Sequence, residues 1–154
     1  MAISDDIALL SKVKLLQGFD TEQLRLLAFG APKRNLAAGE ELYQQGTITD
    51  GGFVIVSGQI DLVANMGERD TILGNYGPGS LIGEMALITK TTRITSALAH
   101  TDTQLIRLSR TIFLRVLEEF PDLAVILHNR ISESVKDIVE KMDRVRMKLE
   151  REKL

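Results

Sequence analysis

Residues 79–97 read GSLIGEMALITKTTRITSA, and the rest of the chain is best interpreted outward from them. Leu81 and Ile82 are typical of a β-strand, whereas residues 84–87, EMAL, favour a helix. Gly83 separates the two and predicts a short helix that starts there. The start of a helix exposes free N–H groups and the positive end of the helix dipole, and glycine lets a ligand approach that backbone closely. This stretch therefore predicts a site for an anion.

Two charged residues complete this candidate site. Arg93 lies nine residues after Glu84, at the start of the next β-like segment, and a planar guanidinium there can hold a phosphate through two hydrogen bonds. Glu84 can accept a hydrogen bond from a sugar hydroxyl. A phosphate beside a sugar hydroxyl indicates a nucleotide. The alternative, from spacing alone, is that Glu84 and Arg93 form a salt bridge within a turn.

Glycine divides the chain into three parts. Ten of the 12 glycines fall between Gly39 and Gly83, and none follows Gly83. Because glycine permits the positive φ angles of tight turns, the middle predicts short strands and the glycine-poor ends predict helices. The expected strands lie near residues 34–37, 41–45, 53–57, 59–65, 70–76, 93–99 and 103–108. The expected helices follow the apolar residues between Ile7 and Leu16, then residues 21–29, 110–119 and 122 to near the end.

These elements predict an α+β fold. An antiparallel double-stranded β-helix, a jelly-roll barrel, is expected between N-terminal helices and a long C-terminal helix. Asp20, with Gln23 three residues later, predicts a capping box for the helix near 21–29. Ser109 is expected to cap the helix near 110–119, which Pro121 ends. We expect residues 1–120 to hold the N-terminal helices, the barrel and the following short helix, and residues 121–154 to form the long helix.

The long helix carries an apolar seam. Its members follow one another at spacings of 4, 3, 4, 3 and 4 residues, as in a heptad repeat: Ile131, Val135, Ile138, Met142, Val145 and Leu149. We expect this seam to pair two copies of the chain as a homodimer. Lys141 and Lys148 flank it on one side, and Arg146 and Lys153 on the other. In a parallel pair these residues face like charges, so a weak dimer or an acidic partner of another kind remains an alternative.

Residues 82–93 resemble the phosphate-binding cassette of cyclic nucleotide-binding domains, such as those of the catabolite activator protein and of protein kinase A regulatory subunits. The family pattern is Phe or Ile, Gly-Glu, a short helix of Leu/Met-Ala-Leu type, and an Arg that opens a strand. Residues 82–87 read IGEMAL, and Arg93 keeps the Glu-to-Arg spacing of the kinase type. Residues 53–58, FVIVSG, and residues 36–46 resemble further strands of the family. The resemblance covers nearly the whole chain, from about residue 13 to about residue 150.

The resemblance implies roles for these residues. Arg93 would hold the exocyclic phosphate oxygens, Glu84 would accept from the ribose 2′-hydroxyl, and the backbone amides of Met85, Ala86 and Ile94 would complete the phosphate pocket. The implied ligand-binding set is Ile82, Gly83, Glu84, Met85, Ala86, Arg93, Ile94 and Thr95. The apolar residues Val135 and Ile138 of the long helix form a candidate lid over the purine.

Two residues depart from the family pattern. Thr92 stands where proline usually precedes the arginine, and Ile94 stands where Ala, Ser or Thr usually follows it. Ile94 offers no hydroxyl to the ligand, and its β-branched side chain is bulky enough that it could crowd the purine. The choice between cAMP and cGMP therefore stays open.

The resemblance also implies a function. It is that of a regulatory sensor, not an enzyme, which binds cAMP or cGMP without a further cofactor and relays binding through its long helix to a protein partner. Because the chain ends at Leu154, we expect no helix-turn-helix domain and no direct DNA binding. A dimeric interaction module that kept the fold and lost the ligand remains an alternative, and so does another phosphorylated ligand such as a dinucleotide.

Composition excludes several other classes. With 19 basic and 21 acidic residues the net charge is −2, which argues against a general nucleic-acid binder. The chain has no cysteine, and His100 and His128 are its only histidines, so a metalloenzyme of the cupin-barrel class is not expected. No apolar run approaches the ~20 residues of a membrane span, and the polar N-terminus does not resemble a signal peptide. We expect a cytoplasmic domain of bacterial type.

Overall fold

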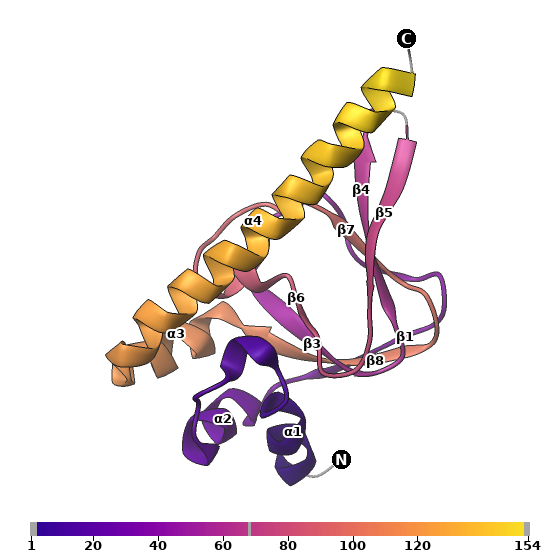
Figure 1. The fold of residues 1–154 in the computed structure, drawn as a ribbon. Coiled ribbons are helices and arrows are strands. Elements are labelled where there is room, and N and C mark those ends of the chain that lie inside the picture. The colour runs from indigo at the N-terminus through magenta and orange to yellow at the C-terminus, as the bar shows by residue number, and fades with distance from the viewer. Residues whose placement is uncertain (1–2, 68, 153–154) are drawn as a thin grey trace.

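The computed structural model describes residues 3–67 and 69–152, and its elements follow the expected order of helices, strands and helices (Figure 1). Residues 1–2, 68 and 153–154 of the two expected units lie outside the described residues. Across the described residues, no helix combines the length and the apolar character needed to cross a membrane.

The N-terminal part is helical. It contains α1 (Ile3–Leu10), the short 3₁₀ helix η1 (Lys14–Leu16) and α2 (Thr21–Ala28). The capping box is confirmed, because the Asp20 side chain accepts from the Gln23 amide and the Gln23 side chain accepts from the Asp20 amide, both at 2.8 Å. These reciprocal bonds satisfy two of the free N–H groups at the start of α2 and fix where the helix begins.

Eight strands of the described residues form two antiparallel sheets. The first sheet has the order β1 (Lys33–Leu36), β8 (Thr103–Ser109), β3 (Gly51–Ser57) and β6 (Leu81–Ile82). The second has the order β2 (Glu41–Tyr43), β7 (Ser96–Ala99), β4 (Ile60–Met66) and β5 (Arg69–Tyr76). The predicted jelly-roll topology is confirmed. The two sheets face one another without closing into one continuous barrel (Figure 1).

The apolar run in β3 explains how the layers are joined. Val54 and Ile55 are both fully buried, but they belong to different clusters. Ile55 points between the two sheets, whereas Val54 packs against the helices on the outer face of the first sheet. A strand buried on both faces is apolar at consecutive positions, and each buried side chain of this size contributes about 1.5–3 kcal/mol.

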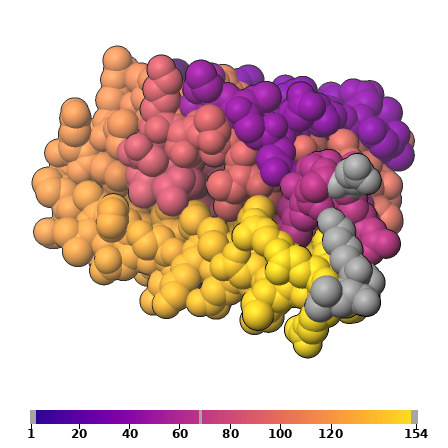
Figure 2. Space-filling model, turned by 90° about the horizontal axis from the view of Figure 1, so that it is seen from above, coloured from indigo at the N-terminus to yellow at the C-terminus, as the bar shows by residue number. Residues whose placement is uncertain are grey.

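Two helices complete the chain. Ser109 caps α3 (Arg110–Glu119) as predicted, since its hydroxyl accepts from the Ile112 amide at 3.2 Å. Pro121 is the first residue of α4 (Pro121–Glu152), a position that suits proline because the first N–H of a helix has no partner. The early turns of α4 pack on α3, η1 and the loop after β6, and its later turns continue past the β4–β5 hairpin (Figure 1; yellow in Figure 2).

One predicted strand boundary differs from the structure, and the predicted short helix is present as a 3₁₀ helix. The strand expected at 93–99 begins only at Ser96, and Arg93 lies in the preceding loop, next to an isolated bridge between Ile48 and Thr92. The helix expected to start at Gly83 is a four-residue 3₁₀ turn, η2 (Glu84–Leu87). Because the dipole of a helix sums over its length, one turn supplies only a small part of the predicted attraction for an anion.

Candidate functional site

A left-handed glycine opens the cassette segment, residues 82–95. Gly83 follows β6 with a φ of +72°, and η2 begins directly after it. Residues with a Cβ rarely adopt this φ. A Cβ here would also collide with Nη1 of Arg93. Glycine is therefore required both by the backbone and by the arginine that lies against it.

Arg93 is buried and held at several points. Its Nη1 donates to the Gly83 carbonyl at 3.2 Å, and its Nη2 donates to the Gly51 carbonyl of β3 at 2.7 Å. The central carbon of the guanidinium lies 4.1 Å from the centroid of the Tyr43 ring, and only 9% of Arg93 is exposed. Burial lowers the pKa of Arg93, but an arginine stays charged. The site therefore contains a fixed positive charge with a planar face.

Glu84 has a different partner. It is 8% exposed, and its carboxylate accepts a hydrogen bond from the hydroxyl of Ser134 on α4. Glu84 and Arg93, both among the described residues, form no ion pair with each other, so the alternative of a simple salt bridge between them does not hold. The carboxylate connects the cassette to the long helix, and the guanidinium connects it to the sheets.

The residues after η2 alternate between two faces. Arg93 and Thr95 are buried, at 9% and 3% exposure, whereas Ile94 is 39% exposed. The Ile94 side chain thus lies on the opposite face from Arg93 and Thr95. Of the other predicted site residues, Ile82 and Ala86 are buried and Met85 is half-buried. The Ala86 amide donates to the Gly83 carbonyl at 3.2 Å and closes η2.

Tyr43 is a site residue that the sequence analysis missed. Besides its contact with Arg93, the Tyr43 ring stacks on Phe53, with centroids 6.4 Å apart and an interplanar angle of 28°. Burial raises the pKa of Tyr43 to about 12, against the smaller lowering effects of Arg93 and Thr95. The sequence predicts a strand that contains Tyr43, but nothing in residues 41–43 indicates that this side chain meets an arginine fifty positions later.

Arg110 is a second missed residue. Its Nη1 lies 3.0, 3.2 and 3.1 Å from the carbonyl oxygens of Thr49, Ala86 and Thr89. These contacts join the end of η2 and the loop after it to the first residue of α3. A cation satisfies several carbonyls that no helix or strand ladder reaches.

The long helix lies over the site, but the seam residues have different environments. Ile138, a candidate lid residue, packs against the cluster between the sheets, as Tyr43 and Tyr76 do. Val135, the other candidate, is half-buried. Ile131 is fully buried within its own chain and offers no surface to a second copy. Met142, Val145 and Leu149 remain partly exposed further along α4.

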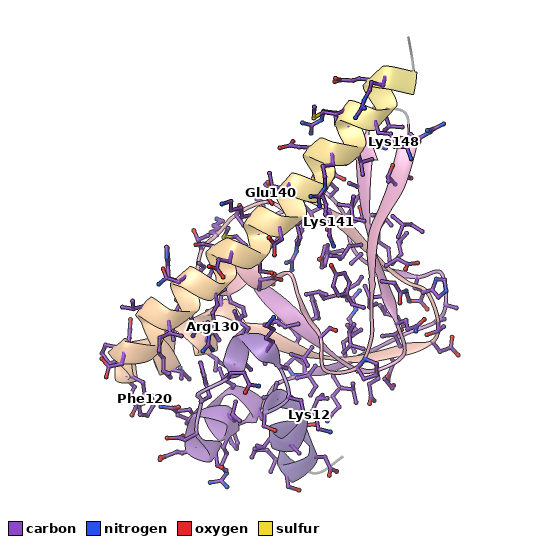
Figure 3. All side chains as sticks on the ribbon, viewed as in Figure 1. Lys12, Phe120, Arg130, Glu140, Lys141 and Lys148 are labelled. Carbon is purple, nitrogen blue, oxygen red and sulfur yellow. The ribbon has the colours of Figure 1, made fainter. Side chains whose placement is uncertain are left out.

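A cavity of about 930 Å³ lies between η1, the turn before β6 and the early turns of α4. Glu84 and Ser134 line it, and Arg93 does not. Arg130 crosses one side of the cavity and donates to the carbonyls of Leu15 and Gln17 at 3.0 and 2.6 Å, where α4 passes the N-terminal turn (Figure 3). Arg130 thereby fixes α4 to the N-terminal helices one turn before Ser134.

The two histidines lie apart. His100 contacts Asp61 at 2.9 Å in the second sheet, and His128 is exposed on α4. Within residues 3–67 and 69–152, no cluster of His, Cys, Asp and Glu side chains has the arrangement of a metal site.

Comparison with known proteins identifies a family for this geometry. The family model for the cyclic nucleotide-binding domain matches residues 33–120. A cyclic nucleotide-binding-like protein from Brucella abortus is 48% identical, with a TM-score of 0.66, over 74% of this chain and 98% of that one. The catabolite activator protein of Thermus thermophilus is 26% identical, with a TM-score of 0.72, over 85% of this chain and 62% of that one.

The curated relatives are much longer proteins. A lysophospholipase from Neosartorya fischeri is 27% identical over 136 residues, which is 88% of this chain. The chain spans only 9% of that protein's length, so the similarity concerns one part of it.

Proposed function

Because this chain belongs to the cyclic nucleotide-binding domain family, we propose that it is a regulatory protein that binds cAMP or cGMP in the cassette segment and relays binding through α4. The observation that carries the proposal is Arg93, a buried guanidinium held by two backbone carbonyls and an aromatic ring. A charged group is costly to bury without an anionic partner, and a phosphate that reaches it would supply one.

The proposed contacts follow the family pattern. The exocyclic phosphate oxygens bind Arg93 and the backbone of Met85, Ala86 and Ile94, and the ribose 2′-hydroxyl binds Glu84. Ile82, Gly83 and Thr95 line this part of the site, and Val135 and Ile138 cover the purine from α4. The exposure of Ile94 supports this arrangement, because its side chain leaves the buried face free.

Isothermal titration of cAMP and cGMP into the chain, the Arg93→Ala variant and an Arg146→Ala control tests the proposal. Arg146 is an exposed arginine on α4. A hydrogen bond to a charged group is worth about 1.5–3 kcal/mol, so Arg93→Ala should weaken binding at least about tenfold. The Arg146→Ala control should bind as the unmodified chain does. Equal affinity of Arg93→Ala and the control refutes the assignment of Arg93. Absence of binding by the unmodified chain favours the ligand-less interaction module.

The relay is proposed to run through the bond between Ser134 and Glu84. A ribose hydroxyl that binds Glu84 acts on the same carboxylate that holds α4, so ligand and helix become linked. Hydrogen exchange of residues 121–152 should change when the nucleotide is added. The change should shrink in Ser134→Ala and persist in Ser132→Ala, an exposed neighbour. Identical exchange with and without nucleotide in the unmodified chain contradicts the relay.

A homodimer and a protein effector complete the proposal. The partly exposed seam residues Val135, Ile138, Met142, Val145 and Leu149 are the proposed contact surface. Light scattering at increasing protein concentration should approach twice the 17.1 kDa mass of one chain. A mass that stays at 17.1 kDa at all concentrations contradicts the homodimer and leaves the seam for a different partner.

A further inference from the structure

We propose that Tyr43 is a positioning residue of the nucleotide site, whose ring sets the plane of the Arg93 guanidinium before a ligand arrives. The inference rests on the proposed function and adds a residue to it. The guanidinium lies over the ring at 4.1 Å, close enough for the positive charge to be attracted by the π-electrons. Tyr43 lies in β2, and Arg93 lies in the loop just before β7, the strand that pairs with β2 in the second sheet.

The Tyr43 ring is itself held from more than one side. Phe53 of β3 stacks beside it, and the ring packs against the apolar cluster between the sheets. The backbone on either side of Arg93 is also paired, since the Arg93 amide donates to the Thr47 carbonyl at 2.8 Å. The ring and the arginine therefore occupy positions that the two sheets determine without any ligand.

This arrangement leaves some N–H groups of the Arg93 guanidinium available to an anion. One face of it is covered by Tyr43, and Nη1 and Nη2 each donate to a carbonyl. Arginine carries further N–H donors beyond these two, in the plane that the ring fixes. Binding to such a group costs less ordering of the side chain than binding to a mobile arginine, which is how preorganisation improves affinity.

The phenol also remains neutral in the conditions under which a nucleotide would bind. Burial raises the pKa of Tyr43 to about 12, so no phenolate forms near neutral pH. The ring thus attracts the guanidinium through its face without presenting a negative charge that would compete with a phosphate. A carboxylate in this place would attract Arg93 as well, but it would repel the ligand.

A set of matched variants tests the inference by titration with cAMP and cGMP. Tyr43→Phe keeps the ring and should bind within about threefold of the unmodified chain. Tyr43→Leu removes the ring and should bind up to about tenfold more weakly, because an arginine that is no longer oriented must be ordered on binding, at about 0.5–1.5 kcal/mol. Tyr76→Leu is the control, because Tyr76 packs on the same apolar cluster, and it should bind more tightly than Tyr43→Leu.

An Arg93→Lys background separates positioning from general damage to the fold. Lysine has no planar group to orient, so adding Tyr43→Leu to it should cost less than about threefold. A structural role predicts the same tenfold loss in both backgrounds. Unchanged affinity of Tyr43→Leu overturns the proposal. Tighter binding also overturns it, because the ring would then obstruct the ligand.

A second measurement needs no ligand and keeps the inference testable if neither nucleotide binds. The NMR signals of the Arg93 side chain should be shifted upfield by the ring current in the unmodified chain and in Tyr43→Phe. They should return to ordinary values in Tyr43→Leu. Unshifted signals in the unmodified chain overturn the positioning role, whereas shifted signals without nucleotide binding refute only the proposed ligand.

Discussion

Replacing Gly83 by alanine should damage the site more than it damages the fold. Gly83 has a φ of +72°, and an added Cβ would collide with Nη1 of Arg93. The left-handed conformation costs a residue with a Cβ about 1–2 kcal/mol. The collision adds a second effect, because Arg93 must leave the position in which it bonds the Gly83 carbonyl.

A matched glycine isolates the second effect. Gly39, in the turn between β1 and β2, has a φ of +90°, and nothing lies within 4 Å of the Cβ that alanine would add there. Both alanine variants should therefore lose about 1–2 kcal/mol of unfolding free energy. Only Gly83→Ala should also lose nucleotide affinity, by about tenfold to a hundredfold, if the displaced Arg93 forfeits a charge-assisted hydrogen bond of about 1.5–3 kcal/mol.

Urea unfolding and isothermal titration with cAMP and cGMP, on the two variants and the unmodified chain, supply the comparison. Similar unfolding free energies with different affinities support the reasoning. If both variants lose the same affinity, backbone strain alone explains the result. If Gly83→Ala binds as tightly as the unmodified chain, then Arg93 can move without consequence, and its observed position has no role in binding.

Two further predictions concern stability. Asp6 on α1 is buried and accepts from Nζ of Lys33 on β1 at 2.8 and 3.1 Å, so Asp6→Asn should lower the unfolding free energy by about 1.5–3 kcal/mol. Asp5→Asn, at an exposed neighbour, should not, and equal urea midpoints would contradict the prediction. The pKa of Tyr43 is about 12 in the folded protein, against an ordinary value of 10.0. The contribution of the neutral phenol to the unfolding free energy is therefore complete below pH 10 and is lost as the pH rises to about 12. Over this pH range the Tyr43→Phe variant should lose about 2 kcal/mol less unfolding free energy than the unmodified chain. Parallel curves of unfolding free energy against pH for the two proteins would refute the prediction.

The local signals of the sequence were sufficient for much of the fold. The capping box at Asp20 and the cap at Ser109 need only residues three positions away, and both are confirmed. The apolar run of β3 was also predicted as a strand. The sequence did not show that the two faces of this strand pack in two different apolar clusters. Gly83 was correctly predicted to separate a strand from a short helix, because its neighbours change abruptly from strand to helix preference.

The site depended on contacts that local patterns do not encode. Tyr43 and Arg93 are fifty residues apart, as are Glu84 and Ser134, and each pair meets only when the sheets and α4 have packed. The strand expected from residue 93 was placed too early for a similar reason. The apolar alternation there resembles a strand, but the Arg93 carbonyl and amide bond Gly46 and Thr47 outside any regular ladder, and β7 begins later.

Arg93 and Glu84 are held by different parts of the molecule, and this difference suggests the route by which a signal would leave the site. Arg93 is held by Gly51 and Tyr43, which belong to β3 and β2, elements embedded in the two sheets. Glu84 is held by Ser134 of α4, a helix that packs on α3, η1, η2 and β5 and belongs to neither sheet. A ligand that binds both residues connects a rigid anchor to a movable one. Since the packed sheets yield least, a change on binding should appear at Glu84 and travel along α4, beyond the point where Arg130 fixes the helix to the N-terminal turn.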